Sequence, residues 1–351
     1  MYIQCFSMRK SNFIKLYRVR YQEKRRTEKY KKTRINRVKA RIPNSSQNTG
    51  WSKVEPEKVP APEKLSLINY PNELVNYLKI VKKTAKYGHP ILVDISHVTV
   101  MTYETIPVLI SFIKNKKYFY DGQIHGNAPD KECLKKIFTE SGFYDFVNSK
   151  SKFKSATENL LHQESNFKVK PEIAGRVTDL IETALDFNVT EDELEAIYNI
   201  FIELMSNTHH HADMTKYGQT KWWLFAHCAK DEINITFVDQ GIGIFKSRVV
   251  KEKIKKLGLN IKILTNLILV DDLLDGKIQS RIDIDNEIRG KGLPQIVEYS
   301  KLDVFESFYI ITNDIWINLK NRDRKKLTNS FNGTLINFTI KNTNIHGRIK
   351  D

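Results

Sequence analysis

Hydrophobic residues in the second half of this 351-residue chain follow helix spacing and strand spacing in turn. Apolar residues recur every three or four positions over 171–187 and 190–212, which predicts two successive helices. Two runs rich in β-branched and aromatic residues follow at 219–229 and 232–239, and the polar pair Lys230-Asp231 between them predicts a hairpin.

The rest of this half contains polar and glycine-rich segments between shorter apolar elements. Residues 245–287 are charged and contain two helical stretches split near Gly258. Residues 293–299 have the spacing of a short helix, and the alternating run at 335–340 predicts a strand. Helices and strands therefore mix along the chain, which favours an α/β fold.

The first half repeats this mixture on a smaller scale. Helical periodicity is present at 73–87, 106–114 and 135–146, and a short apolar strand is predicted at 91–95. This alternation predicts a second, smaller α/β domain.

Breaks in the pattern divide the chain into four segments. Residues 43–62 are rich in Pro, Ser and Asn, and the region from 150 to 170 is polar and lacks periodicity. We therefore expect a basic arm with a linker at 1–62, a small α/β domain at 63–150, a linker at 151–170 and a larger α/β domain at 171–345.

Charge is concentrated at the N-terminus. The formal net charge is +16, and residues 1–45 hold 15 Lys and Arg against Glu23 and Glu28. From Glu23 to Arg41 the apolar residues are too few to fold alone. Such an arm could contact nucleic-acid phosphates, anionic lipid or an acidic protein, or be a solvated segment, and these alternatives stay open.

Cysteine usage and hydropathy bear on the location of the protein. Cys5, Cys133 and Cys228 are too few and too scattered for a disulfide framework, which favours a reducing, cytoplasmic environment. No apolar run approaches the roughly twenty residues that span a bilayer, so no transmembrane segment is expected.

Candidate chemistry begins on the helix predicted at 190–212. Glu203 and Asn207 are four residues apart and therefore lie on one face of that helix. A carboxylate can orient or deprotonate a water or hydroxyl, and an amide oxygen is a ligand that Mg2+ accepts beside phosphate oxygens. On their own, the two residues also fit a solvated helix face.

Three glycine-containing segments follow in order. Asp239 ends a predicted strand and precedes Gly241 and Gly243, which let the backbone approach a flat ligand closely. A carboxylate at this place can accept a hydrogen bond from an exocyclic amine such as adenine N6. The other two segments comprise Gly290, Lys291, Gly292 and Leu293 at a predicted helix start, and Gly333 with Thr334 before the last predicted strand.

These four segments, in this order, resemble the motifs of the Bergerat-fold ATP-binding family, which includes gyrase, the ninety-kilodalton heat-shock chaperones, histidine kinases and mismatch-repair ATPases. The resemblance covers about 170–342 and implies an α/β sandwich with a mixed sheet covered by helices. It implies that Glu203 is a catalytic base, that Asn207 binds Mg2+ and that Asp239 recognises adenine. The residues it implies in ATP binding are Asn207, Asp239, Gly241, Gly243, Gly290, Lys291, Gly292, Leu293 and Thr334.

The smaller predicted domain resembles the STAS fold of anti-anti-sigma factors. The resemblance rests on an aspartate, aliphatic and serine pattern at 94–96 and on Asn127-Ala128-Pro129 before the last helix. The family's phosphoacceptor turn aligns with 102–105, where its usual serine is missing. Glu104 in this turn would supply a permanent negative charge where phosphorylation normally adds one.

Together, the two resemblances imply a regulatory protein that binds Mg-ATP and either hydrolyses ATP or transfers its phosphate. Residues 245–287 would form a lid that couples the nucleotide state to a partner surface, which belongs to another protein or to a second copy of this chain. Two alternatives stay open. One is an ATP-sensing interaction module without catalysis, and the other is a serine/threonine kinase of the anti-sigma type.

Overall fold

The structure is a computed structural model of the chain. It describes residues 55–119, 121–147, 159–165, 169–185, 189–211, 221–229, 232–246, 266–277 and 292–341. The chain divides into two compact units, Met1–Ser52 and Lys53–Asp351, and every described residue belongs to the second. The predicted basic arm, Gly290 and Lys291 lie outside the described residues. Within the described part, no helix has the length and apolar character needed to cross a bilayer.

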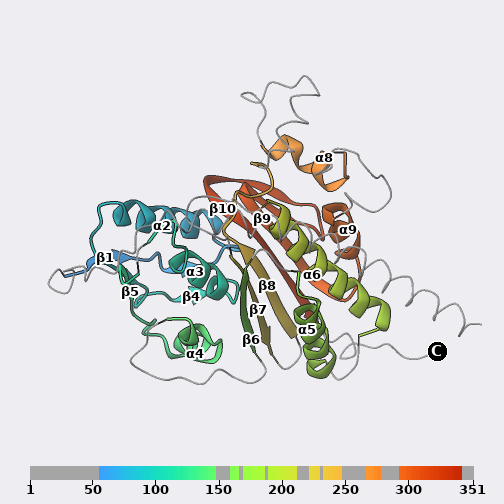
Figure 1. Cartoon of the computed structure of the whole chain (residues 1–351), viewed down its shortest axis with the longest axis horizontal. Coiled ribbons are helices and arrows are strands. Elements are labelled where there is room, and N and C mark those ends of the chain that lie inside the picture. The colour runs from blue at the N-terminus through green and yellow to red at the C-terminus, as the bar shows by residue number, and fades with distance from the viewer. Residues whose placement is uncertain are drawn as a thin grey trace, which may run out of the picture. The chain divides into compact units, whose positions relative to one another are not determined.

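The N-terminal elements combine a small parallel sheet with three helices (Figure 1). Strands β1 (Glu57–Pro60), β3 (Ile91–Asp94) and β5 (Ile124–Gly126) pair in the order β1-β3-β5. The other elements are β2 (Lys64–Leu65), α2 (Pro71–Ala85), β4 (Val100–Met101), α3 (Thr105–Ile113), α4 (Glu132–Glu140) and the 3-10 helix η2 (Phe143–Asp145).

Two sequence predictions for this region need correction. Strand β1 lies inside the segment that was expected to be an arm and linker. It nevertheless belongs to the fold, since Val59 is buried and the strand pairs with β3. The single helix expected at 135–146 is broken after α4, because Gly142 adopts a φ of 81° that a continuous right-handed helix cannot contain.

Asp94 joins the ends of β3 and β5. Its Oδ1 accepts hydrogen bonds from the Ser96 amide (3.1 Å), the Ser96 hydroxyl (2.7 Å) and the Asn127 side-chain amide, and its Oδ2 pairs with Lys58 Nζ at 2.8 Å. Burial would raise the pKa of the Asp94 carboxyl, but the hydrogen bonds from Lys58, Asn127 and Ser96 hold this pKa well below its usual value.

This network predicts how the folded chain responds to acid. Because the pKa of Asp94 is lower in the folded state, its stabilising contribution is present above the unfolded pKa, about 4, and is lost as the pH falls below it. Asp94→Asn should lower the Tm at pH 7 and reduce the further loss of Tm between pH 5 and pH 3. Thermal unfolding measures both, with Asp130→Asn at an exposed position as control. Unchanged acid sensitivity in Asp94→Asn would contradict this role.

The C-terminal elements build a five-stranded sheet in the order β6-β7-β8-β10-β9. Its strands are β6 (Leu160–Ser165), β7 (Lys221–Cys228), β8 (Glu232–Asp239), β9 (Phe305–Asn318) and β10 (Arg324–Lys341). The helices are α5 (Pro171–Ala184), α6 (Glu191–His211), α8 (Val270–Leu274), α9 (Gly292–Tyr299) and the 3-10 helix η3 (Asn266–Leu269).

The sheet differs from the expectation in two ways. Every neighbouring pair is antiparallel, so the expected mixed sheet is wrong. Short connections join β7 to β8 and β9 to β10, and such connections produce antiparallel pairs. Residues 151–170, expected as a linker, contain β6, whose Leu160 and Leu161 pack on opposite faces of the sheet.

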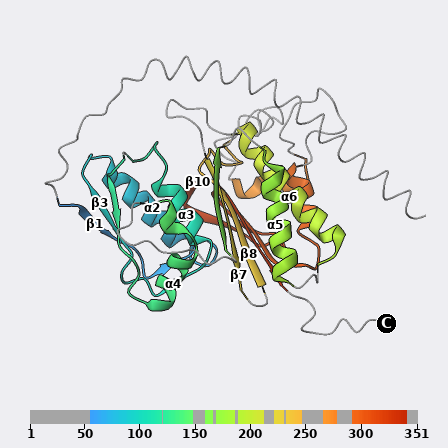
Figure 2. The same ribbon diagram turned by 60° about the horizontal axis from the view of Figure 1, so that its bottom comes forward.

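Both faces of this sheet are buried. On β7, Trp222 and Leu224 pack in one core with residues of α5 and α6, whereas Trp223 and Phe225 pack in a second core with the N-terminal elements. Figure 2 shows α5 and α6 on one side of the sheet and α2 and α3 on the other. The run WWLFA does not alternate between apolar and polar residues, because neither face of β7 meets water.

Polar contacts also join the N-terminal elements to the sheet. The Trp316 indole donates a hydrogen bond to the Ile68 carbonyl at 3.0 Å, and the Tyr103 ring stacks on His227 with centroids 3.7 Å apart. The two segments expected as separate domains thus share a continuous core.

Candidate functional site

Helix α6 positions the first pair of candidate residues. Its start is closed by a capping box, in which the Glu193 amide donates to Thr190 Oγ1 (3.3 Å) and the Thr190 amide donates to Glu193 Oε2 (2.8 Å). Its apolar stripe is buried against the sheet. Glu203 and Asn207 lie one turn apart beside this stripe and are half-buried.

Gly292, the first residue of α9, lies against these two side chains. A Cβ atom placed on Gly292 would be 2.9 Å from Glu203 Oε2 and 3.5 Å from both Nδ2 and Oδ1 of Asn207. A methyl group would crowd the Glu203 carboxylate, so glycine here permits the close approach. The structure therefore brings the predicted motif of Glu203 and Asn207 together with Gly292 of a later motif. The N-terminus of α9 lies beside the Glu203 carboxylate.

The predicted motifs that contain Asp239 and Thr334 meet on the sheet. Asp239 is the register partner of Trp222 on β7 and of Thr334 on β10, and Thr334 is in turn the partner of Thr312 on β9. Phe237, Ile336 and Ile310, two residues away on their strands, belong to the core that contains α6. Strand alternation therefore directs Asp239, Thr334 and Thr312 to the α6 side of the sheet.

The Asp239 carboxylate is held by backbone amides. Its Oδ1 accepts a hydrogen bond from the Gly241 amide at 2.7 Å, and the Thr334 amide also donates a hydrogen bond to the carboxylate. Burial raises the pKa of Asp239 to about 6, and the two amides oppose this rise without cancelling it. A further hydrogen bond donated to the Asp239 carboxylate would therefore stabilise its ionised form.

Gly333 makes this arrangement sterically possible. It has a φ of 110°, and a Cβ there would lie only 1.9 Å from the Asp239 carbonyl oxygen. Strands β8 and β10 can come together at this point only if the residue has no side chain.

Two residues that the sequence analysis missed hold the loop after Asp239. Asn313 has a left-handed φ of 54°, donates from Nδ2 to the Ile242 carbonyl (2.8 Å) and accepts from the Phe245 amide (3.0 Å). Thr312 accepts from the Ile244 amide at 2.9 Å. A Cβ on Gly243 would lie 2.5 Å from Asn313 Nδ2, so this glycine is required by packing inside the chain. Residue type alone did not single out either position, because both lie within the long strand β9.

The predicted residues thus fall into two groups. Glu203, Asn207 and Gly292 form one, and Asp239, Gly241 and Thr334 form the other. Leu293 packs at the edge of the core that contains α6. Gly290, Lys291 and most of the predicted lid at 245–287 lie outside the described residues.

The turn before α3 does not present a charge on the surface. Glu104 is 1% exposed, and its Oε1 accepts hydrogen bonds from the Ser66 hydroxyl (2.7 Å) and the Leu67 amide (3.0 Å). Thr102 also donates to this oxygen, and Thr105 is fully buried with its hydroxyl on the Leu65 carbonyl. The Glu104 carboxylate, expected to supply a negative charge in this turn, therefore lies in the interior, where these donors satisfy it.

Comparison with family models and curated proteins identified no relative of this chain. No protein-family model matches the chain, and no curated protein matches it.

Proposed function

We propose that this chain is a regulatory protein of the Bergerat class that binds Mg-ATP and hydrolyses it or transfers its phosphate. The observation that supports this best is the position of Gly292 beside Glu203 and Asn207. Two motifs far apart in the sequence meet there, and this juxtaposition supports a common binding site.

The residues present fit ATP. At Gly292 the missing side chain lets the backbone lie close to a carboxylate and a carboxamide, and the first amides of a helix have no partners within the helix. These amides suit phosphate oxygens. On the sheet, Asp239 would accept a hydrogen bond from the adenine N6 amine, and Gly241 allows the base to lie close to the backbone.

The residues also fit Mg2+ held jointly with phosphate. The Asn207 carboxamide oxygen would be its protein ligand, and the bound ion would neutralise phosphate charge. Glu203 would orient a water or hydroxyl and accept its proton.

The first test is binding of nucleotides to the full-length chain by titration calorimetry. We expect saturable binding of Mg-ATP, weaker binding when EDTA removes the metal, and much weaker binding of Mg-GTP, because guanine presents a carbonyl where adenine presents N6. Phosphate release is then measured with the same preparation. No binding of ATP would contradict the proposal.

A sensor without catalysis is the second candidate, and one contact favours it. Gln240, directly after Asp239, donates from Nε2 to the Ser111 hydroxyl of α3 at 3.0 Å, and both residues are buried. Nucleotide binding at Asp239 could therefore act on the N-terminal elements directly. Tight ATP binding without phosphate release, alone or with a partner, would favour the sensor.

The turn before α3 is expected to stay unphosphorylated. Thr105 is fully buried and cannot reach a phosphate without local unfolding, and half-buried Thr102 would have to give up the hydrogen bond that its hydroxyl donates to Glu104. Incubation of the full-length chain with Mg-ATP should leave its intact mass unchanged. A stoichiometric gain of one phosphate on either threonine would establish a kinase that acts on its own chain.

A further inference from the structure

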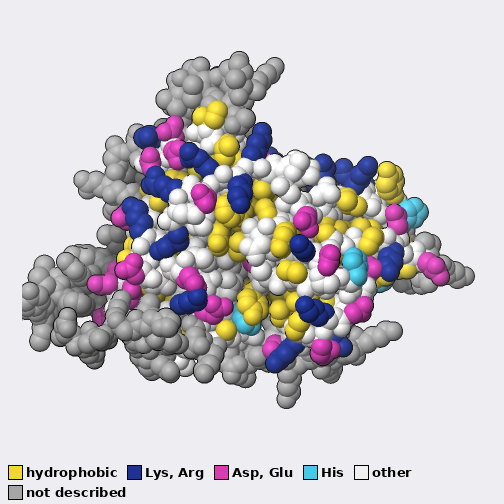
Figure 3. Space-filling view, turned by 180° about the vertical axis from the view of Figure 1, so that it is seen from behind, with side chains coloured by type: hydrophobic (Ala, Val, Ile, Leu, Met, Phe, Trp, Pro, Cys, Tyr) yellow, Lys and Arg dark blue, Asp and Glu magenta, His cyan; other side chains and the backbone are white. Residues whose placement is uncertain are grey.

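A cluster of lysines covers the outer surface of α2 and the segments beside it. We call it the lysine patch, and its members are Lys79, Lys82, Lys83, Lys86, Lys117 and Lys246. The sequence contains no Asp or Glu over 79–90 or 113–120. In Figure 3, Lys and Arg side chains gather along the upper right edge, over α2.

Contacts show that these lysines from three segments lie together. Lys82 Nζ stands 3.7 Å from the centre of the Tyr118 ring, which follows α3. Lys79 donates to Asn329 Oδ1 at 2.6 Å, and Lys246 lies 3.3 Å from Ser330 Oγ on the same part of β10. The patch therefore extends from α2 across β10 to Lys246, after Asp239 in the chain.

The positive charges of the lysine patch repel one another. Burial, and after it the neighbouring charges of Lys117, Lys86 and Lys246, lower the pKa of Lys82 to about 8. Asp121 is an acidic residue at the edge of the lysine patch, and its carboxylate pairs with Lys116 Nζ at 3.3 Å. Such an accumulation of like charge costs stability, and a bound polyanion would relieve that cost.

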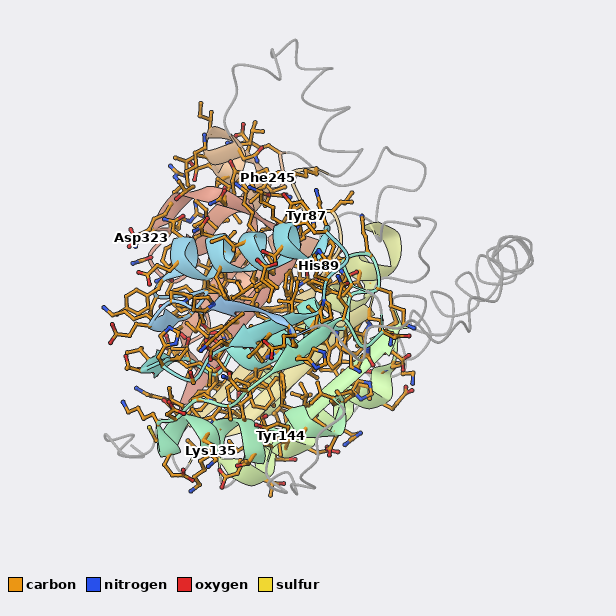
Figure 4. The ribbon with its side chains drawn as sticks, turned by 90° about the vertical axis from the view of Figure 1, so that its left-hand side faces the viewer. Tyr87, His89, Lys135, Tyr144, Phe245 and Asp323 are labelled. Carbon is orange, nitrogen blue, oxygen red and sulfur yellow. The ribbon has the colours of Figure 1, made fainter. Side chains whose placement is uncertain are left out.

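Exposed apolar side chains accompany the charge. Tyr87 is 70% exposed and Ile80 is 45% exposed; Ile80 lies on α2, and Tyr87 lies two residues after its end. Among the described residues, the large apolar side chains that are exposed also include Val100 and Ile268. Figure 4 labels Tyr87 at the end of α2, well separated from Lys135 on α4.

We propose that the lysine patch with Tyr87 binds single-stranded nucleic acid without sequence preference. Lysines spaced along a helix from 79 to 86 span about 10 Å and can follow several phosphates of a strand. An exposed tyrosine ring offers a stacking surface for a base. The patch contains lysines and no arginine, so it lacks the forked donors that distinguish individual bases.

A membrane surface fits this patch less well. The apolar stripe of α2, which includes Leu74, Leu78 and Val81, is buried in the core and cannot enter a bilayer. Only Ile80 and Tyr87 would remain for insertion, whereas helices that lie in a membrane interface bury a whole apolar face.

The test is fluorescence anisotropy of a labelled twenty-nucleotide poly-dT strand titrated with the full-length chain at several salt concentrations. The variant K79A/K83A/K86A should bind more weakly and reduce the slope of log affinity against log salt by about 2, since each phosphate contact on a single strand contributes about 0.7. Tyr87→Ala should weaken binding about tenfold, and Tyr87→Phe should retain it.

The control variant K131A/K135A/K136A removes the same charge from the surface around α4. Equal losses in both triple variants would overturn the proposal, because binding would then follow net charge alone. Wild-type salt dependence in K79A/K83A/K86A would overturn it as well, and would assign binding to the arm at 1–45. Patch-dependent binding to phosphatidylserine vesicles, with no binding to poly-dT, would replace nucleic acid by a membrane. The inference does not depend on ATP binding.

Discussion

Glu203→Ala is expected to bind Mg-ATP with nearly wild-type affinity and to release phosphate about a hundred-fold to ten-thousand-fold more slowly. The reason is that a positioned general base contributes roughly this factor to a rate, while nucleotide affinity rests on other groups. Glu203 lies beside Gly292, where phosphates are proposed to bind. Adenine is proposed to bind elsewhere, at Asp239. Calorimetry for binding and a phosphate-release assay for turnover separate the two effects.

The same helix offers a matched control. Glu195 lies two turns before Glu203 on α6 and is exposed, so Glu195→Ala should leave both binding and turnover unchanged. If Glu203 only stabilises the start of α9, Glu203→Ala would lower the Tm and leave the rate of phosphate release per folded molecule unchanged. That outcome would remove the base from the proposed mechanism.

Asp239→Asn is expected to weaken ATP binding by roughly tenfold to a hundred-fold, because an exocyclic amine of adenine would lose its charged acceptor. The variant should also discriminate less between ATP and GTP, since the asparagine amide can donate to a guanine carbonyl. Calorimetry with both nucleotides measures these changes. Wild-type ATP affinity in Asp239→Asn would contradict the adenine-binding role.

The pH dependence provides an independent test of the same residue. The pKa of Asp239 is raised to about 6, so its carboxylate becomes protonated as the pH falls through 6 and ATP affinity should fall with it. The stability of the ligand-free chain should change in the opposite direction. A raised folded-state pKa stabilises the fold below the unfolded pKa, about 4, and this contribution is lost as the pH rises through 6. Asp239→Asn should abolish both dependences near pH 6.

Local pattern was enough to predict several elements of the site. The periodicity of 190–212 placed Glu203 and Asn207 on one face of α6, and the apolar run at 232–239 placed Asp239 at the end of β8. Glycine spacing indicated Gly241 and Gly243 as points where the backbone approaches a neighbour closely, and Gly243 lies against Asn313. These inferences succeed because helix and strand periods and the small size of glycine are properties of neighbouring residues.

The partners of those residues depended on the tertiary structure. Asn313 and Thr312 hold the loop after Asp239 from a strand that returns far later in the chain. Strand β6 joins the sheet although its segment looks like a linker, because pairing with β7 satisfies its backbone. Glu104, predicted to lie in a turn, is buried and accepts hydrogen bonds from Ser66 and Leu67. Each of these outcomes depends on contacts between residues distant in sequence, whose free energies no local pattern contains.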